Sequence, residues 1–426
     1  MSGTALCAVL TAALAVPFGA WAQATERGGM WAGLRLTERF LTRDTTSPDP
    51  AVDGRTIQAV TDIDLSYGTE TRTEAFTLEA GAGYAVTDGP ATDGVEGAFL
   101  SPNAELRYEQ AAASASIMVT VTASRVDLAD VSPLSVSDSS GEALPSDVAD
   151  LQDGGTRTQL GFNSRLTLRD DAPFGIALGL RVNDIGYADL PPGSGLEDST
   201  TARGDVTGRF EISPVLQATL GTHYTYSRTD EAAQGDRYGL SAGATLTRPN
   251  GAYTLAADRS DGDGGAITAL SFGRSVALPQ TEAGLVLGVT QATDDTLFVT
   301  GSASLDHAFG EGSALGPLTL SADRSVSLAG RSNEELITSL SLGGSYALTP
   351  LATLRLTAEL GQAEAVATGD TVTLSEVGLS LGYDFGRDWR GAADIRAKSR
   401  DPSDEAATAS TTFAVSVTRS FDAQLR

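Results

Sequence analysis

The chain has 426 residues, with 29 basic and 55 acidic side chains and a net charge of −26. This balance excludes nucleic acid as a partner, because a nucleic-acid-binding face must be basic. The single cysteine, Cys7, lies near the start of the chain, so the remainder can form neither a disulfide framework nor a cysteine metal site.

The first segment resembles a secretion signal in its composition. Residues 5–17 form an apolar run without charge, and small-residue sites follow at 20–22 and 22–24. The pattern predicts a signal peptide over residues 1–24, cleaved after Ala22 or Ala24. The run is shorter than the roughly 20 residues of a spanning helix. No later stretch is apolar for that length, so the chain is expected to be periplasmic, secreted or in the outer membrane.

From about residue 28 onward, apolar and polar residues alternate. Residues 353–360 place three leucines and Ala358 on one face, and Arg355, Glu359 and two threonines on the other. A period of two predicts strands with unlike faces. The same alternation covers residues 160–168, 174–182 and 413–421. No helical stripe is found, so the fold class is predicted to be all-β.

Short and long connections alternate along the chain. Short turn signals stand at 69–71, 170–173, 213–214, 248–251, 348–350 and 386–388. Longer polar stretches stand at 42–55, 127–155, 188–200, 229–235, 330–333 and 400–405. Short turns on one side and long loops on the other are typical of a transmembrane β-barrel, whose long loops are extracellular.

Counting backward from a C-terminus assumed to be periplasmic gives twenty strands. The last strand is predicted at about residues 407–421 and the first at about 30–41. Residues 91–107 and 307–316 are ambiguous and could change the count by two, so 18 strands is the alternative. We predict a single antiparallel up-and-down barrel over residues 25–426. An even count places both termini in the periplasm.

The composition of the two faces favours a membrane barrel over a soluble sandwich. Aromatic residues make up only 6% of the chain, which is low for a large packed β core, and the polar faces are rich in Gly, Ser and Thr. Small inward residues match a wide lumen. Aromatics near strand ends are typical of interfacial girdles; these are Tyr67, Tyr84, Tyr108, Tyr224, Tyr226, Tyr383 and Phe385. The predicted lipid-facing set includes Leu160, Phe162, Leu166, Leu168, Phe174, Ile176, Leu178 and Leu180.

Residues 413–421 resemble the amphipathic last strand of Gram-negative outer-membrane proteins, although Asp422 and four further residues follow the final aromatic. Residues 33–40, 65–68 and 71–73 are similar to segments of uncharacterised alphaproteobacterial barrels. The resemblance implies a porin-like or polysaccharide-secretion-type barrel. It also implies outer-membrane lipid, lipopolysaccharide and the barrel-insertion machinery as partners.

Charged residues on the polar phase are expected to face the lumen, because an outward Arg at mid-membrane costs about 2–4 kcal/mol. Opposed basic and acidic groups would create a transverse field across a pore, or would simply neutralise each other. The candidate lumen residues are Arg35, Arg107, Arg165, Arg181, Arg209, Arg355, Glu79, Glu105, Asp205 and Glu359.

The stretch 127–155 carries seven acidic residues and no basic one, and we expect it to be an extracellular loop that sets any ion preference. Three readings stay open: it folds inward and favours cations, it binds Ca²⁺ at the surface, or it is simply solvated. The residues are Asp127, Asp130, Asp138, Glu142, Asp147, Asp150 and Asp153.

Other motifs are weak. His223 and His307 stand in no metal-binding or hydrolase signature, so neither an enzyme nor a cofactor is predicted. A short Ala-Asp-Arg-Ser repeat places Arg259 and Arg324 on the outward phase, where lipopolysaccharide phosphates could bind them; shared strand composition explains the repeat equally well.

Three functions fit the sequence: a passive channel for small solutes or an exported polysaccharide, a structural or adhesive surface barrel without flux, and a secreted soluble β-protein.

Overall fold

The computed structural model describes residues 29–47, 53–90, 96–128, 155–169, 171–190, 196–229, 235–262, 265–310, 312–328, 334–366, 368–403 and 406–425. The predicted signal peptide lies outside the described residues. Among the described residues, no helix has the length and apolarity needed to cross a membrane.

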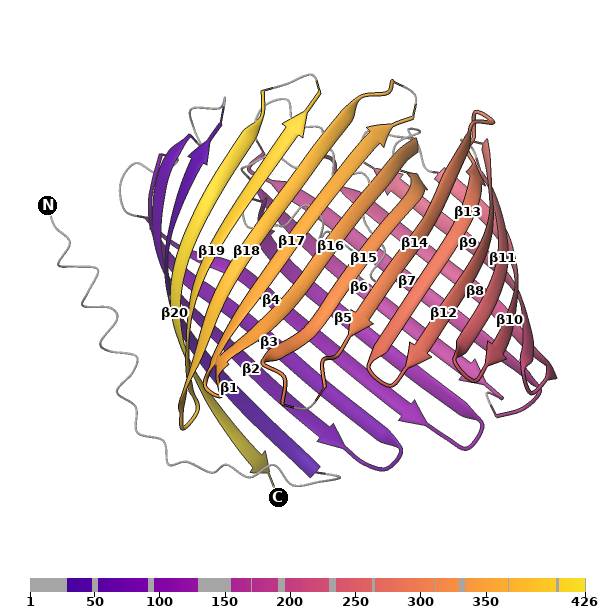
Figure 1. Cartoon of the computed structure of the whole chain (residues 1–426), viewed down its shortest axis with the longest axis horizontal. Helices are drawn as coiled ribbons and strands as arrows, with labels where there is room; N and C mark the ends of the chain where they lie inside the picture. Colours follow the sequence, from indigo (N-terminus) through magenta and orange to yellow (C-terminus); the bar gives the residue numbers. More distant parts are fainter. Residues whose placement is uncertain are drawn as a thin grey trace, which may run out of the picture.

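Twenty antiparallel strands form one sheet that closes on itself, because β1 pairs with both β2 and β20 (Figure 1). The strands are β1 (Gly29–Thr46), β2 (Gly54–Glu70), β3 (Glu74–Asp88), β4 (Glu96–Ala111), β5 (Ala115–Asp127), β6 (Thr156–Leu168), β7 (Phe174–Ala188), β8 (Ser199–Ser213), β9 (Leu216–Thr229), β10 (Gly235–Arg248), β11 (Gly251–Gly262), β12 (Gly265–Leu278), β13 (Thr281–Gln291), β14 (Leu297–His307), β15 (Leu315–Leu328), β16 (Glu334–Thr349), β17 (Ala352–Ala365), β18 (Thr371–Gly386), β19 (Trp389–Pro402) and β20 (Thr408–Leu425).

The all-β barrel class and the count of twenty strands are confirmed. The predicted strand ends were too short: β1 runs five residues past Leu41, and β20 runs four residues past Phe421 to pair Leu425 with Met30. Strands of 11 to 18 residues reach or exceed the roughly 9–11 needed to span the hydrocarbon. The strands continue because an antiparallel ladder satisfies backbone groups beyond the bilayer as well.

The two ends of the barrel differ in their connections. At one end, here called the turn end, most strands are joined by two or three residues, and both Gly29 and Leu425 lie there. The opposite end, the loop end, carries the connection 128–155. The predicted alternation of short and long connections was wrong at two places: only residues 263–264 join β11 to β12 at the loop end, and residues 308–314 join β14 to β15 at the turn end.

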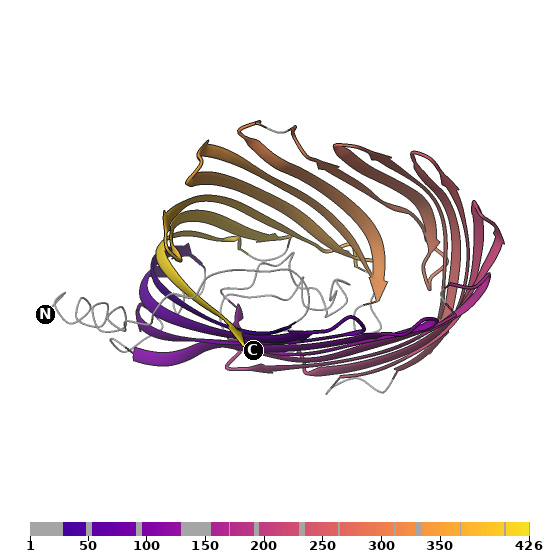
Figure 2. The same cartoon turned by 90° about the horizontal axis from the view of Figure 1, so that it is seen from below.

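The barrel is flattened in cross-section. Figure 2 shows the indigo-to-magenta strands of the first half along one long side and the orange strands of the second half along the other. This shape brings β6–β9 opposite β12–β15 across the short axis of the lumen.

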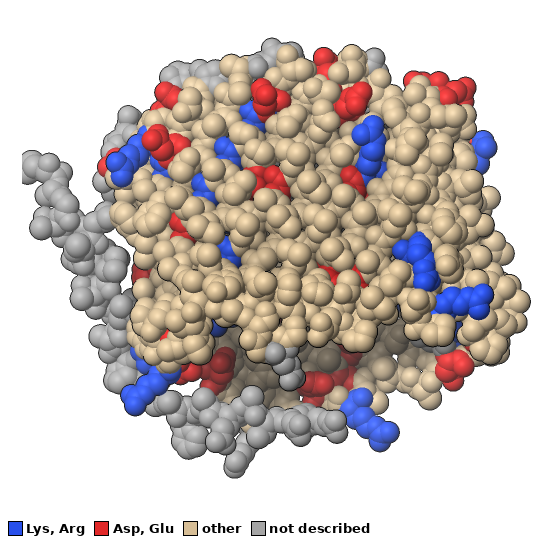
Figure 3. Space-filling model, in the orientation of Figure 1, with Lys and Arg blue, Asp and Glu red and all other residues tan. Residues whose placement is uncertain are grey.

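The outer face is apolar. The lumen cavity near β1 and β2 is lined by Asp62 and Asp64, so the alternate residues Ile63 and Leu65 face outward, and they are 45% and 55% exposed. Register carries this phase around the barrel, and the visible outer surface in Figure 3 is mostly tan. On β6 and β7 the outward set contains all eight residues predicted to face lipid.

Aromatic pairs lie on the outer face near both ends. At the turn end, Phe174 packs against Phe210 with ring centroids 5.1 Å apart, and the Arg274 guanidinium lies 4.2 Å from the Tyr253 ring centroid. At the loop end, Tyr224 and Tyr238 are 5.0 Å apart. Two such belts match the interfacial girdles of membrane barrels.

A few outward positions are charged. Register places Arg259 and Arg324 on the outer face toward the loop end, on the outward phase predicted for them. Glu38 also faces outward, near the middle of β1, where its two carboxylate oxygens accept from the Thr61 hydroxyl at 2.9 and 3.1 Å. The hydrogen bonds give this carboxylate a partner within the sheet.

Candidate functional site

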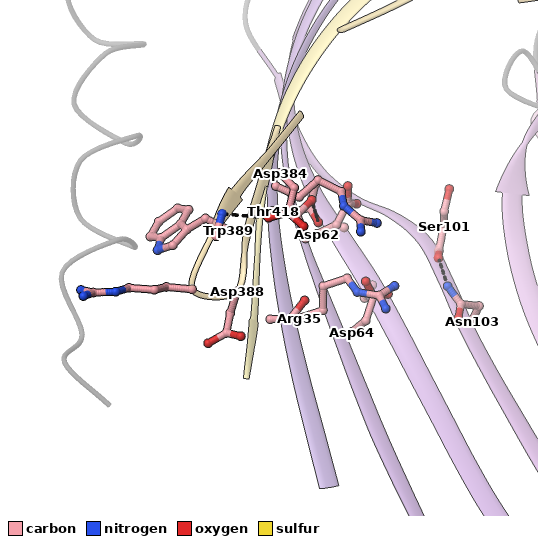
Figure 4. Close-up of a pocket in the computed structure, with 16 residues that line it drawn as sticks. Arg35, Asp62, Asp64, Ser101, Asn103, Asp384, Asp388, Trp389 and Thr418 are labelled. Atoms are coloured by element: carbon pink, nitrogen blue, oxygen red, sulfur yellow. Dashed lines mark hydrogen bonds between the residues drawn. The ribbon is translucent and has the colours of Figure 1, made fainter. Parts of the chain in front are cut away.

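The inward face near the β1–β20 closure carries a mixed-charge cavity of about 850 Å³. Arg35 on β1 is the register partner of Asp64 on β2, and Arg39 Nη2 lies 3.7 Å from Asp62 Oδ2. Figure 4 shows Arg35, Asp62 and Asp64 extending from these strands toward the side on which Asn103 lies. Opposite charges share this space, so the cavity is polar without a strong excess of either sign.

The predicted lumen residues on β3 and β4 lie beside this cavity. Glu79 and Glu105 are direct register partners on the inward face. Arg107 lies two residues after Glu105 on β4, nearer the turn end. It forms an ion pair with Glu109, and its Nε donates to Glu109 Oε1 at 2.6 Å. The inward face of β1–β5 therefore carries charges of both signs, with acids in slight excess.

The inward face of β6–β10 is dominated by basic residues, which we call the arginine wall: Arg157 and Arg165 on β6, Arg181 on β7, Arg203 and Arg209 on β8, and Arg237 on β10. Inward acids on the same strands are Asp205 and Glu211. One register row runs from Arg181 through Arg203 and Thr225 to Arg237.

Arg181 and Arg203 stand directly opposite each other on β7 and β8. Directly opposed side chains have Cβ atoms about 4.5–5.5 Å apart, and like charges at that spacing destabilise a sheet. Arg165 lies one row away, beside Gly179, whose lack of a side chain leaves room around the Asp205 carboxylate. A fixed group of cations facing a lumen is suited to hold or attract an anion.

The lumen set predicted from the sequence included Arg165, Arg181, Arg209 and Asp205 but missed Arg157, Arg203 and Arg237. Arg203 has the same phase as Asp205 and Arg209 along β8, so extending that alternation would have found it. Arg237 follows a polar connection that hides the phase of β10. Arg209 differs from the others because its Nη2 donates to the Ala172 carbonyl at 3.1 Å, which ties it to the β6–β7 turn.

His223 lies within the arginine wall, with Asp205 and Gly239 as its register partners. A Cβ at Gly239 would collide with the imidazole ring, so the ring lies across this glycine. His307 lies at the turn end, 2.9 Å from the Thr281 hydroxyl. Within the described ranges, no group of three His, Cys, Asp or Glu side chains is arranged to hold a metal ion.

A third charged group lies on β17–β19. Glu359, Glu376 and Lys398 follow one another in a register row on the inward face. Glu376 Oε1 forms an ion pair with Arg396 Nε at 3.0 Å, and Glu376 Oε2 lies 3.9 Å from Lys398 Nζ. Lys398 is the only lysine of the chain. Arg355, the last predicted lumen residue, points inward beside Ser380.

The inward face of β11–β16, which we call the hydroxyl wall, is different. It consists mainly of Ser, Thr and Gly; the Ser321 and Ser341 hydroxyls are 2.6 Å apart, and those of Thr290 and Thr300 are 3.1 Å apart. In the part of these strands that the structure describes, no Arg or Lys faces inward. The inward charges are Asp258, Glu282, Asp306, Asp323 and Glu335.

No family model matches the chain, and no curated protein matches it. Among solved structures, OpdK of Pseudomonas aeruginosa with vanillate is 13% identical, covers 92% of this chain and 99% of its own, and has a TM-score of 0.42. OccAB4 of Acinetobacter baumannii is 11% identical, with 93% and 99% covered and a TM-score of 0.41. A mutant of the ferric enterobactin receptor PfeA of P. aeruginosa is 11% identical, with 93% and 81% covered and a TM-score of 0.49. Likeness at this level is too low for a property of those proteins to be carried over to this chain.

Proposed function

We propose that the chain is a passive channel in the outer membrane of a Gram-negative cell, with both termini in the periplasm, and that the arginine wall favours small anionic solutes. The observation that carries the proposal is the charge of the lumen. A chain with a net charge of −26 places six arginines and only two acids on the inward face of β6–β10 next to the lumen.

The outer face supports the membrane location. A closed barrel leaves no unpaired edge strand, which is the condition for strands to cross a bilayer. Its outward leucines, such as Leu180 and Leu220 at 46% and 58% exposure, are exposed all around the wall, and soluble proteins rarely expose so continuous an apolar surface. The secreted soluble alternative is therefore disfavoured.

The inner face supports flux over a purely structural barrel. The inward residues of the hydroxyl wall are small, which leaves space, and the arginine wall stands across the short axis from a wall whose inward charges are acidic (Figure 2). Such an arrangement directs a field across the lumen. A positive wall raises the local concentration of anions beside it, and more steeply for anions of higher charge. We infer a non-enzymatic role, in which the wall orients solutes rather than transforms them.

Conductance in a planar bilayer tests the proposal. The purified protein should open channels, and a KCl gradient should give a reversal potential of the sign expected for chloride preference. Neutralising Arg165, Arg181 and Arg203 to Gln should strongly reduce that preference. The outward Arg259→Gln variant is the matched control and should leave it unchanged. A protein that inserts but never conducts would favour the structural or adhesive barrel instead.

We also propose two partners outside the lumen. Lipopolysaccharide phosphates are the proposed partners of Arg259 and Arg324, and the insertion machinery is the proposed partner of β20. Of the seven acids in 127–155, only Asp127 is described, as the last residue of β5; the other six lie outside the described residues. We also propose that this segment favours cations or binds Ca²⁺, and deleting residues 130–150 tests its effect on cation permeability.

A further inference from the structure

The seam between β14 and β15 is the shortest ladder of the barrel. Seven residue pairs join the two strands, from His307 with Leu318 to Gly301 with Arg324. The flanking seams are longer, with eleven pairs between β13 and β14 and twelve between β15 and β16. The next shortest ladder in the described barrel, between β4 and β5, has nine pairs.

Beyond the pair Gly301–Arg324, each strand continues without the other. β14 extends to Leu297 and pairs with β13 up to that residue, and β15 extends to Leu328 and pairs with β16 up to that residue. The same register, continued, would pair Thr300 with Ser325 and Val299 with Val326. We call the region in which these described residues no longer pair the fork; it lies at the loop end.

Local sequence does not prevent pairing at the fork. Thr and Val are good strand formers, and no proline interrupts either strand there. The β4–β5 ladder ends for a different reason. Its last pair is Asn103–Ser124, next to Pro102, which has no N–H to donate, and to Ser101, whose φ is 46°. The fork therefore needs another cause.

Gly301 supplies that cause. Its φ of 156° departs from the usual strand conformation, and a Cβ at this position would collide with the carbonyl oxygen of Val286 on β13. Glycine lets β14 press close to β13 at the point where it leaves β15. The top of β14 is also fixed independently: Thr296 N and Oγ1 donate to the Asp294 carboxylate at 2.9 and 2.7 Å, which lowers the pKa of Asp294.

The side chains at the fork combine apolar and polar character. On the outer face, Leu297 and Val299 are 67% and 69% exposed, and Val299 is level with Val289 in the apolar band. Arg324 faces outward at the base of the fork, where its Nη1 donates to the Thr338 hydroxyl at 3.3 Å. On the lumen side, Thr300 and Ser325 supply hydroxyls. Unpaired backbone groups cost several kcal/mol in an apolar medium, so water or a solute must satisfy the strand edges.

We propose that the fork is a lateral port through which small amphipathic anions pass between the lumen and the outer leaflet. The proposal rests on the proposed channel function. An apolar tail matches Leu297 and Val299 on the outer rim, and an anionic head matches Arg324 at the base and the arginine wall inside. A purely hydrophilic anion has no reason to use this route, because it gains nothing from the apolar rim.

Closing the fork with a disulfide tests the port. Thr300→Cys with Ser325→Cys places two thiols at the positions that the continued register would bring into bonding range. Ser304→Cys with Ser321→Cys is the matched control, because that pair lies on the same inward phase within the existing ladder. The probes are decanesulfonate and ethanesulfonate, which carry the same permanent charge and differ in their tails. Their equilibration is measured in proteoliposomes before and after reduction.

We expect the oxidised Thr300–Ser325 variant to slow decanesulfonate severalfold, to leave ethanesulfonate unchanged and to recover on reduction, while the control shows no change. Equal slowing of both anions, or no slowing despite a disulfide verified by thiol titration, overturns the port. Where the disulfide does not form, Ser325→Trp should fill the fork and give the same selective slowing, and its failure to do so also overturns the port. Failure of ethanesulfonate to cross through the wild-type protein would instead contradict the channel itself.

Discussion

The arginine wall and the hydroxyl wall are built alike on the outside and unlike on the inside. Leu180 on β7 and Leu287 on β13 face outward at 46% and 58% exposure within similar apolar bands. Inward, β6–β10 carry six arginines, whereas β11–β16 carry hydroxyls, glycines and acids. The comparison indicates that contact with lipid restricts the residues of the outer face to apolar types, whereas the residues of the inner face can differ according to the solute.

The physical reason is the unequal cost of a charge on the two faces. A lipid-facing charge must be desolvated, so the outer face accepts few charges. A lumen-facing charge remains hydrated, so either sign is tolerated there. Where the inner face nevertheless collects one sign against the net charge of the chain, as in the arginine wall, function is the better explanation.

The largest effect should follow a charge placed outward on either wall. Leu180→Arg and Leu287→Arg should each lower the free energy of unfolding by about 2–4 kcal/mol, because both side chains lie in the lipid-facing band. Ser302→Arg, inward on the hydroxyl wall beside Asp323, should change it little. Denaturant titration of the barrel folded in liposomes measures all three. Equal losses for Ser302→Arg and Leu287→Arg would contradict the distinction between the faces.

The next effect concerns the contrast between the walls. Neutralising Arg165, Arg181 and Arg203 to Gln should reduce the anion-to-cation permeability ratio by about tenfold, the lower part of the range by which charged clefts concentrate ions. Reversal potentials at low salt measure the ratio, and high salt should weaken the effect through screening. A ratio that is unchanged in a fully conducting triple variant would show that the arginine wall does not filter ions.

A smaller shift of opposite sign is expected from the acidic connection. Deleting residues 130–150 should reduce cation permeability and so raise the anion preference, while barrel assembly stays intact. The strands that flank the segment, β5 and β6, pair directly from Asp127 with Thr156 onward, so the barrel has no need of it. Unchanged reversal potentials in a conducting deletion variant would leave the connection as a solvated loop without a filtering role.

The last prediction concerns local environment rather than flux. A nitroxide at Leu166 should be accessible to oxygen, and one at Arg165 should be accessible to a water-soluble relaxation agent, because the two residues lie on opposite faces of β6. Leu340 and Ser341 offer the same comparison on the hydroxyl wall. A reversed pattern on either wall would invert its phase, since a slip of one residue exchanges every side chain.

Much of the lumen set followed from local alternation. The phase of β17 and β7 is legible from the leucines around Arg355 and Arg181, so their inward placement needed only a period of two. The ends of the strands were predicted less accurately. Pairing with β1 across the closure extends β20 through Leu425, and the local sequence of β20 does not indicate that β1 is its partner. Arg237 was missed because the phase of a strand is lost across a polar connection.

The sequence by itself determined the strands, their number and their two faces, because alternation and turn residues act over a few positions along the chain. Only the tertiary structure decided which inward residues meet. The row from Arg181 through Arg203 to Arg237, the pairing of Glu359 with Glu376, and the fork at Gly301 all depend on register between strands. Register arises from the combined fit of neighbouring strands around a closed ring, and no single segment contains that information.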